Sequence, residues 1–155
     1  MRPKANAGFT LVELLLVLAL VGILSLVAVP QASRLQASFN LQRAARELAA
    51  TIRELQNRAV VEERAYYIQF IYSPDHTRDG YRAGPFGESG SFRALPQGIS
   101  IAYNYLQPKT PLLFYPSGSP NVGASIPLEN KLGDLLTVKV MVATGRVRVV
   151  KGLDG

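Results

Sequence analysis

The amino-acid sequence predicts an α+β protein in which one long N-terminal helix packs on a C-terminal, β-rich head of antiparallel strands. Residues 9–29 form a nearly unbroken apolar run. Apolar residues between 41 and 59 then recur at alternating steps of four and three, which is the pattern of one helix stripe. After Arg64 the period falls to two and β-branched and aromatic residues increase, as strands require.

The composition limits both the size and the chemistry of the protein. A chain of 155 residues is long enough for one domain with an appendage. It contains no cysteine, which excludes a disulfide framework and a thiolate metal site. The formal net charge of +6 favours phosphate-bearing or anionic-lipid partners without choosing between them.

The apolar run from Phe9 to Val29 is long enough for one membrane-spanning helix. At about 1.5 Å per residue it extends roughly 30 Å, the thickness of a bilayer's hydrocarbon core. A secretory signal would place small residues at a cleavage site on the far side of a shorter run. Here the small residue is Gly8, between a basic stretch and the run. Cleavage there would remove residues 1–8 as a leader and leave the helix on the mature chain.

Glu13 is the only charge in this run. A carboxylate inside an apolar span costs about 2.5 to 3.5 kcal/mol on insertion scales, so a compensating cation is expected. Cleavage would create one, the α-amino group of Phe9, on the same chain or on an adjacent copy. Such a pair can fix the register between packed helices. The alternative is a single-pass anchor whose glutamate is tolerated near the membrane interface.

An amphipathic helix is predicted over residues 31–61. Its apolar stripe consists of Leu41, Ala45, Leu48, Ile52, Leu55 and Ala59. The charged residues off this stripe are Arg43, Arg46, Glu47, Arg53, Glu54 and Arg58. Glu54 precedes Arg58 by four residues, a spacing that suits a surface ion pair. We interpret these charges as a solvated face in preference to a binding stripe.

The head is predicted to contain six strands separated by turns rich in glycine, proline and serine. The expected strands are Tyr66–Tyr72, Gly98–Tyr105, Leu112–Tyr115, Ala124–Leu128, Leu135–Val142 and Arg146–Val150. Stretches such as Gly84-Pro85-Phe86-Gly87 are interpreted as turns between them.

The N-terminal segment resembles the class III signal of type IV pilins and type II secretion pseudopilins. The resemblance rests on Gly8-Phe9-Thr10-Leu11-Val12-Glu13, the apolar run and Pro30. It implies cleavage after Gly8 by prepilin peptidase, N-methylation of Phe9, and a role for Glu13 in subunit docking. Pro30 matches a helix-bending proline. The implied organisation is a leader (1–8), a transmembrane and filament-core helix (9–29) and a periplasmic head (30–155).

The second half resembles the GspH/FimT-like minor pilins and pseudopilins. The motifs are Leu95-Pro96-Gln97-Gly98-Ile99, Phe114-Tyr115-Pro116-Ser117-Gly118 and Gly145-Arg146-Val147-Arg148. The family implies a single-pass inner-membrane protein with a periplasmic head, later incorporated into a pilus or pseudopilus. The implied partners are prepilin peptidase, the inner membrane and other pilins, which contact it through the N-terminal helix.

No catalytic constellation is visible in the sequence. His76 is the only histidine and lies in a predicted turn. The stretch from Gly87 to Ser91 lacks the second glycine of a G-x-S-x-G elbow, and no P-loop is present. We therefore expect a non-enzymatic protein without cofactor, metal or small-molecule substrate.

The final hairpin carries a basic cluster. Strand alternation points Leu136, Val138, Val140 and Val142 toward the core, and Thr137, Lys139 and Met141 outward. With a turn at 143–145, Lys139 falls opposite Arg148. Like charges in this arrangement are destabilising unless an anion lies between them. Double-stranded DNA is a candidate anion, and its phosphates would contact Lys139, Arg146, Arg148 and Lys151 without reading sequence.

Several interpretations of this hairpin and of the whole chain remain open. The basic edge can instead serve only to discourage strand addition. The family resemblance favours DNA, because a Gly-Arg-x-Arg motif contributes to DNA binding in FimT-like pilins of DNA uptake. Pseudopilins also carry a Gly-Arg pair there. The competing roles are a DNA-binding subunit of a competence or type IV pilus, a structural pseudopilin of type II secretion and, least favoured, a membrane-anchored periplasmic enzyme.

Overall fold

The computed structural model describes residues 9–73, 79–102, 104, 106 and 109–153, without the side chains of 26–30. Gly8, His76 and the predicted strand residues 103 and 105 lie outside this part of the chain. The chain divides into two compact units, residues 1–36 and residues 37–155. One helix, α1 (Leu11–Val61), contributes to both.

The start of α1 is fixed by Thr10. Its side-chain Oγ1 accepts a hydrogen bond from the backbone N–H of Glu13 at 3.2 Å, and its carbonyl accepts one from Leu14 at 3.2 Å. Threonine in this position satisfies a backbone donor that the helix itself leaves unpaired. Glu13 lies in the first turn of the helix, where the helix dipole favours a negative charge.

The first unit exposes its apolar side chains. In the single chain the large apolar residues of the first helical turns are between 47% and 75% exposed. They are Leu11, Val12, Leu14, Leu15, Leu16, Val17, Leu18, Leu20, Val21, Ile23 and Leu24. Within the described part of the chain, no helix has the combination of length and apolarity that crossing a membrane requires. Pro30 falls within α1, and the bend expected there stays a prediction.

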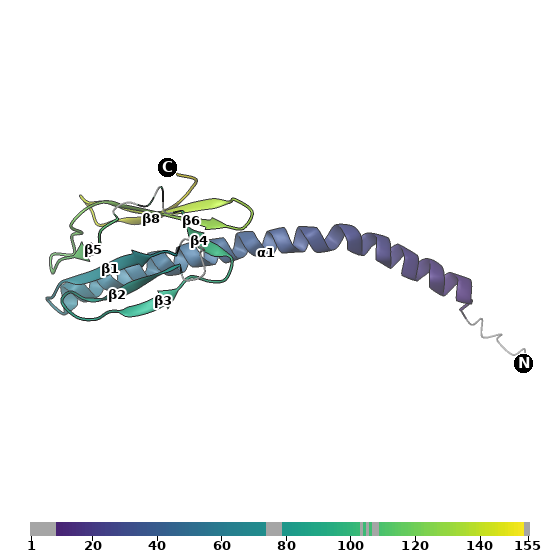
Figure 1. The fold of residues 1–155 in the computed structure, drawn as a ribbon, viewed down its shortest axis with the longest axis horizontal. Coiled ribbons are helices and arrows are strands. Elements are labelled where there is room, and N and C mark those ends of the chain that lie inside the picture. Colours follow the sequence, from purple (N-terminus) through teal and green to yellow (C-terminus); the bar gives the residue numbers. More distant parts are fainter. Residues whose placement is uncertain (1–8, 74–78, 103, 105, 107–108, 154–155) are drawn as a thin grey trace, which may run out of the picture. The chain divides into compact units, whose positions relative to one another are not determined.

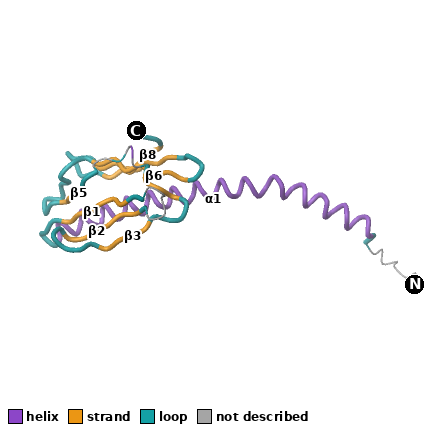
Figure 2. Tube along the Cα trace, viewed as in Figure 1, coloured by secondary structure: helices purple, strands orange, loops and turns teal. Residues whose placement is uncertain are grey.

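The second unit contains two antiparallel four-stranded sheets (Figure 1). In the first sheet the order is β3 (Ser91–Ala94), β2 (Gly80–Pro85), β1 (Tyr66–Ile71) and β5 (Leu112–Phe114). In the second it is β4 (Ile99–Ile101), β6 (Ala124–Asn130), β7 (Leu135–Val140) and β8 (Val147–Lys151). Figure 2 shows these strands in orange and α1 in purple.

The second half of α1 packs on both sheets. All six residues of the predicted apolar stripe, Leu41 to Ala59, are at most 5% exposed, which confirms the stripe. They share one core with Ile68 and Phe114 of the first sheet and with Ile126 and Val138 of the second. The six charged residues predicted to lie off the stripe are exposed. The helix ends at Val61, as the periodicity predicts.

The hairpin of β2 and β3 is absent from the sequence prediction. Glycine and proline in this region indicate turns, but the glycines here allow close packing of neighbouring segments. A Cβ atom at Gly80 would lie 2.8 Å from the Phe92 ring, and one at Gly84 would lie 2.8 Å from the Cα of Gly90. Glycine is therefore needed at both positions because a neighbouring chain segment approaches the backbone.

Two side chains of the final hairpin differ from the prediction in their exposure. Strand β7 ends at Val140, so Val142 lies beyond the ladder and is 51% exposed instead of facing the core. Thr137 alternates with the core-facing Leu136 and Val138 but is buried, and its Oγ1 donates a hydrogen bond to the carbonyl of Gly152 at 2.6 Å. That bond satisfies the hydroxyl and allows its burial. Met141 is exposed as predicted.

A buried carboxylate joins the two sheets. Asp79 is 4% exposed, and its two carboxylate oxygens accept hydrogen bonds from the backbone N–H of Ser73 at 2.9 Å and of Ile101 at 2.8 Å. Ser73 lies two residues after β1 and Ile101 ends β4, so one side chain ties the segment after a strand of the first sheet to a strand of the second. Hydrogen bonds to backbone donors are what make burial of a carboxylate tolerable.

The C-terminal end of α1 is held by a polar cluster. The hydroxyl of Tyr66 donates to Glu62, and Arg58 pairs with Glu62 at 2.9 Å, so the ion pair predicted between Glu54 and Arg58 is wrong. The Arg58 guanidinium lies 5.0 Å from the Tyr66 ring centre. The Tyr66 hydroxyl and Arg58 hold the pKa of the Glu62 carboxyl below its usual value of 4.5. The same hydrogen bond and burial raise the pKa of Tyr66.

These shifts predict the pH dependence of stability. A lowered carboxyl pKa means that Glu62 stabilises the fold above about pH 4.5 and loses this effect as the pH falls through its folded pKa. Tyr66→Phe should reduce that acid-side loss, because the variant lacks the hydrogen bond that favours the ionised carboxyl. This loss of stability is measured by thermal unfolding of the full-length chain in non-ionic detergent, followed by circular dichroism from pH 7 to pH 3. Identical pH profiles for the two proteins would contradict the prediction.

Candidate functional site

The N-terminal motif presents an exposed aromatic residue followed by a capped helix. Phe9 is 86% exposed, Thr10 caps the helix, and Glu13 is exposed in the first turn. Among the described residues, the ion pairs of the single chain do not include Glu13. The sequence signal T-x-x-E at Thr10 and Glu13 indicates this helix start, but we did not predict the cap.

The final hairpin brings two of the predicted cations together. Lys139 on β7 pairs directly with Arg148 on β8, which confirms the predicted register. Arg146 and Arg148 are exposed, whereas Lys139 is half-buried. Arg146 lies just before β8, and its carbonyl accepts a bond from Met141 N–H at 3.0 Å that continues the ladder. The two arginines are therefore the accessible cations of this cluster.

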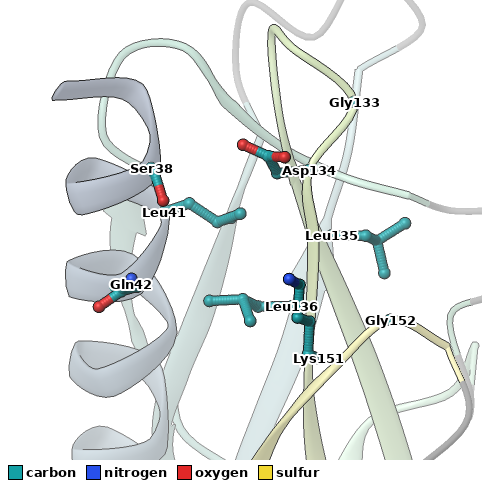
Figure 3. A pocket seen from close by; sticks show the side chains of 9 residues that line it. All are labelled: Ser38, Leu41, Gln42, Gly133, Asp134, Leu135, Leu136, Lys151 and Gly152. Atoms are coloured by element: carbon teal, nitrogen blue, oxygen red, sulfur yellow. The ribbon is translucent and has the colours of Figure 1, made fainter. Parts of the chain in front are cut away.

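Lys151 lies on the opposite face of the sheet from Arg148. It pairs with Leu136, whose side chain is directed toward α1. Both residues line a pocket of about 400 Å³ between α1 and the second sheet (Figure 3). Leu41 on the helix and Leu136 on β7 point toward one another across it. Because side chains alternate between faces along a strand, Lys151 cannot share the surface that carries Lys139 and Arg148.

The segment that carries the arginines is bonded to α1. The side-chain Nε2 of Gln56 donates to the carbonyl of Gly145 at 2.8 Å, and the Arg53 guanidinium donates to the carbonyl of Val147 at 3.1 Å. Gly145 has φ of +61°, and a Cβ there would lie 2.8 Å from Gln56 Nε2 and 3.3 Å from the Gly118 carbonyl. A glycine suits this position for both reasons. Sequence reasoning placed Arg53 on a solvated face and passed over Gln56.

No arrangement typical of a metal site is found among the described residues. They contain no group of three or more histidine, cysteine, aspartate or glutamate side chains able to hold an ion. The polar cluster around Glu62 and Tyr66 is internally paired through Arg58 and lies at the end of α1. Its chemistry is that of a structural cap.

Comparison with known proteins bears on the N-terminal motif and on the fold. A family model described as the prokaryotic N-terminal methylation motif matches residues 3–29. No curated protein matches the sequence. The structure resembles the minor pseudopilin EpsH from the type 2 secretion system of Vibrio cholerae, with a TM-score of 0.53 and 12% identity over 72% of this chain and 97% of the other.

A second likeness is to the type IV minor pilin FimU of Pseudomonas aeruginosa. Its crystal structures in two space groups have a TM-score of 0.53 and 21% identity over 71% of this chain, covering 92% and 87% of theirs. The chain thus combines an N-terminal methylation motif with the fold of minor pilins and pseudopilins. The predicted fold class and the resemblance to the type IV pilin and pseudopilin superfamily are confirmed.

Proposed function

We propose that the chain is a non-enzymatic minor pilin or pseudopilin subunit of a type IV pilus or a type II secretion system. The observation that carries the proposal is the methylation motif at the start of a helix whose apolar residues lie exposed in the single chain. Apolar surface of this extent is unfavourable in water, so the helix needs lipid or other helices around it. The likeness of the head to EpsH and FimU supports the same role.

In this proposal the chain is made as a precursor. Prepilin peptidase removes residues 1–8 by cleaving between Gly8 and Phe9, and the new N-terminus is methylated. Residues 9–29 hold the protein in the inner membrane with the head, residues 30–155, in the periplasm. On assembly the helix exchanges lipid for the helices of neighbouring subunits. The match of the methylation motif to residues 3–29 supports this order of events.

Processing is tested at the N-terminus of the mature protein. We expect the purified protein to begin at Phe9 and to carry one methyl group on its α-amino nitrogen, as measured by mass spectrometry of the N-terminal peptide. Gly8→Leu should retain the leader, because a bulky residue would occupy the position of the small residue before the cut. A mature protein that begins beyond Val29 would contradict the proposal.

Glu13 is the residue that we propose for subunit docking. Its carboxylate is exposed in the first helical turn of the single chain. Among neighbouring helices it would be desolvated, and a cation would then have to compensate it. The α-amino group of Phe9 on an adjacent subunit supplies that cation and would set the axial register of the two helices.

Loss of this carboxylate should impair assembly and spare membrane insertion. Glu13→Ala is expected to reduce the subunit recovered in sheared filaments at least tenfold, while its amount in the membrane fraction stays unchanged. Glu54→Ala is the matched control, because Glu54 is an exposed carboxylate on the part of α1 that packs in the head. Assembly of Glu13→Ala at the wild-type level would remove Glu13 from this role.

The final hairpin favours DNA binding as a second function. Lys139 and Arg148 are directly opposite, so cations of β7 and β8 lie side by side on this hairpin. Arg146 and Arg148 are exposed, and none of the ion pairs found among the described residues involves them. Two residues along an extended strand are about 6.6 Å apart. Each DNA strand presents a phosphate about every 3.4 Å of axis, so the two arginines can reach phosphates of one strand.

We propose a smaller set of DNA contacts than the four cations named from the sequence. Arg146 and Arg148 form the core of the proposed DNA-binding surface, with the half-buried Lys139 behind them. Lys151, on the other face, is not part of it. The alternative is a purely structural pseudopilin for protein secretion, in which the same cations only discourage strand addition at the edge of the sheet. A membrane-anchored enzyme is the least favoured reading.

DNA binding is tested with a charge-matched pair of variants. The full-length chain in non-ionic detergent is titrated into labelled double-stranded DNA at several salt concentrations. Arg146→Gln/Arg148→Gln should lower the slope of log affinity against log salt by about 1.8, and weaken binding on the order of 50-fold at about 0.1 M salt. Arg82→Gln/Arg93→Gln removes the same charge from exposed arginines of β2 and β3. Equal binding by both double variants would remove the hairpin from the DNA site.

A further inference from the structure

The strand that carries the two arginines is an edge strand whose backbone is bonded to α1. Strand β8 is the last strand of its sheet and has β7 on one side only. Arg146 uses its carbonyl to bond Met141 on the β7 side. The carbonyl of Val147 therefore points to the other side, where Arg53 donates to it, and Gln56 donates to the carbonyl of Gly145 just before the strand. The two donors are three residues apart on one helix face.

This bonding pattern fixes where the arginine side chains point. Carbonyl groups and side chains both alternate along an extended strand, so the bond to the Val147 carbonyl sets the direction of the neighbouring residues 146 and 148, and the bond to Gly145 holds the chain just before them. Val147 is 6% exposed and packs into the core, and the arginines on either side of it are exposed. The helix thus holds both guanidinium groups on one side of the hairpin in the absence of any ligand.

We infer that Gln56 and Arg53 are positioning residues of the DNA contact, which they support through the backbone without touching DNA. The inference rests on the proposed DNA-binding function. A loop already held in its bound conformation loses little conformational entropy on binding. A loop freed from α1 would lose conformational entropy for each residue that binding immobilises. Gln56 is the more informative of the two because it is neutral and contributes no electrostatic attraction to phosphate.

The test measures binding of double-stranded DNA by the full-length chain in non-ionic detergent. Gln56→Met removes the donor, keeps the length of the side chain and favours the helix. We expect it to weaken binding about two- to tenfold, the factor that corresponds to one net hydrogen bond. Asn57→Met is the matched control, since Asn57 is the exposed neighbour of Gln56 on the same helix. This variant should bind like the wild type.

A double-mutant cycle separates positioning from a general effect on the fold. In the Arg146→Gln/Arg148→Gln background, Gln56→Met should have no further effect on affinity, because the groups that it positions are gone. The same factor in both backgrounds would overturn the inference. Wild-type affinity in Gln56→Met alone would also overturn it and would leave the proposed DNA function intact. Absence of binding by the wild type would overturn both.

Arg53 provides a second, independent variant. If Arg53 acts through the carbonyl of Val147, Arg53→Met should weaken binding about two- to tenfold without lowering the slope of log affinity against log salt. A fall of the slope by about one would show that Arg53 neutralises a phosphate itself. That result would overturn its positioning role. Melting midpoints recorded for every variant identify any that loses its fold.

Discussion

The contact between the apolar stripe of α1 and the two sheets is the interaction on which the rest of the structure depends. The shared core contains residues of the helix and of both sheets. Complete burial of a leucine or isoleucine side chain contributes roughly 1.5 to 3 kcal/mol. The chain contains no cysteine, so no disulfide supplements this packing.

One helix therefore has two different environments along its length. From residue 41 onward it offers a narrow apolar stripe with charges off it, and this pattern suits a helix with a domain on one side. From Leu11 to Leu24 its large side chains are apolar on every side, which no single partner surface could cover. The stripe from residue 41 onward is buried within the chain. The apolar side chains from Leu11 to Leu24 are exposed in the single chain and need apolar surroundings from outside it.

Sequence periodicity predicted the elements whose residues follow a repeating pattern, and it missed those that depend on the close approach of a neighbouring chain segment. The stripe of α1, its end at Val61 and the pairing of Lys139 with Arg148 all follow from spacing. Strands β2 and β3 were missed because Gly80 and Gly84 indicate turns unless the neighbouring segment is already known. The burial of Thr137 was missed for a similar reason, since its partner is a backbone carbonyl fifteen residues away.

The candidate site shows the same division. Alternation along β8 gave the shared side of Arg146 and Arg148, and would have separated Lys151 from them had it been continued to the end of the strand. The bonds from Gln56 and Arg53 join residues 89 and 94 positions apart, and no local pattern indicates such a contact. Asp79 is comparable, because one donor, Ser73, follows a strand of the first sheet and the other, Ile101, ends a strand of the second.

The acceptors that α1 uses to hold the edge of the second sheet are main-chain carbonyls. A main-chain acceptor does not depend on the identity of the residue that carries it, so residues 146 and 148 can be exchanged without loss of the attachment. Gly145 is restricted by space and by its positive φ, and Val147 by its burial in the core. The exposed side chains of this hairpin can accordingly change between related chains while the fold of the hairpin and its packing on α1 stay constant.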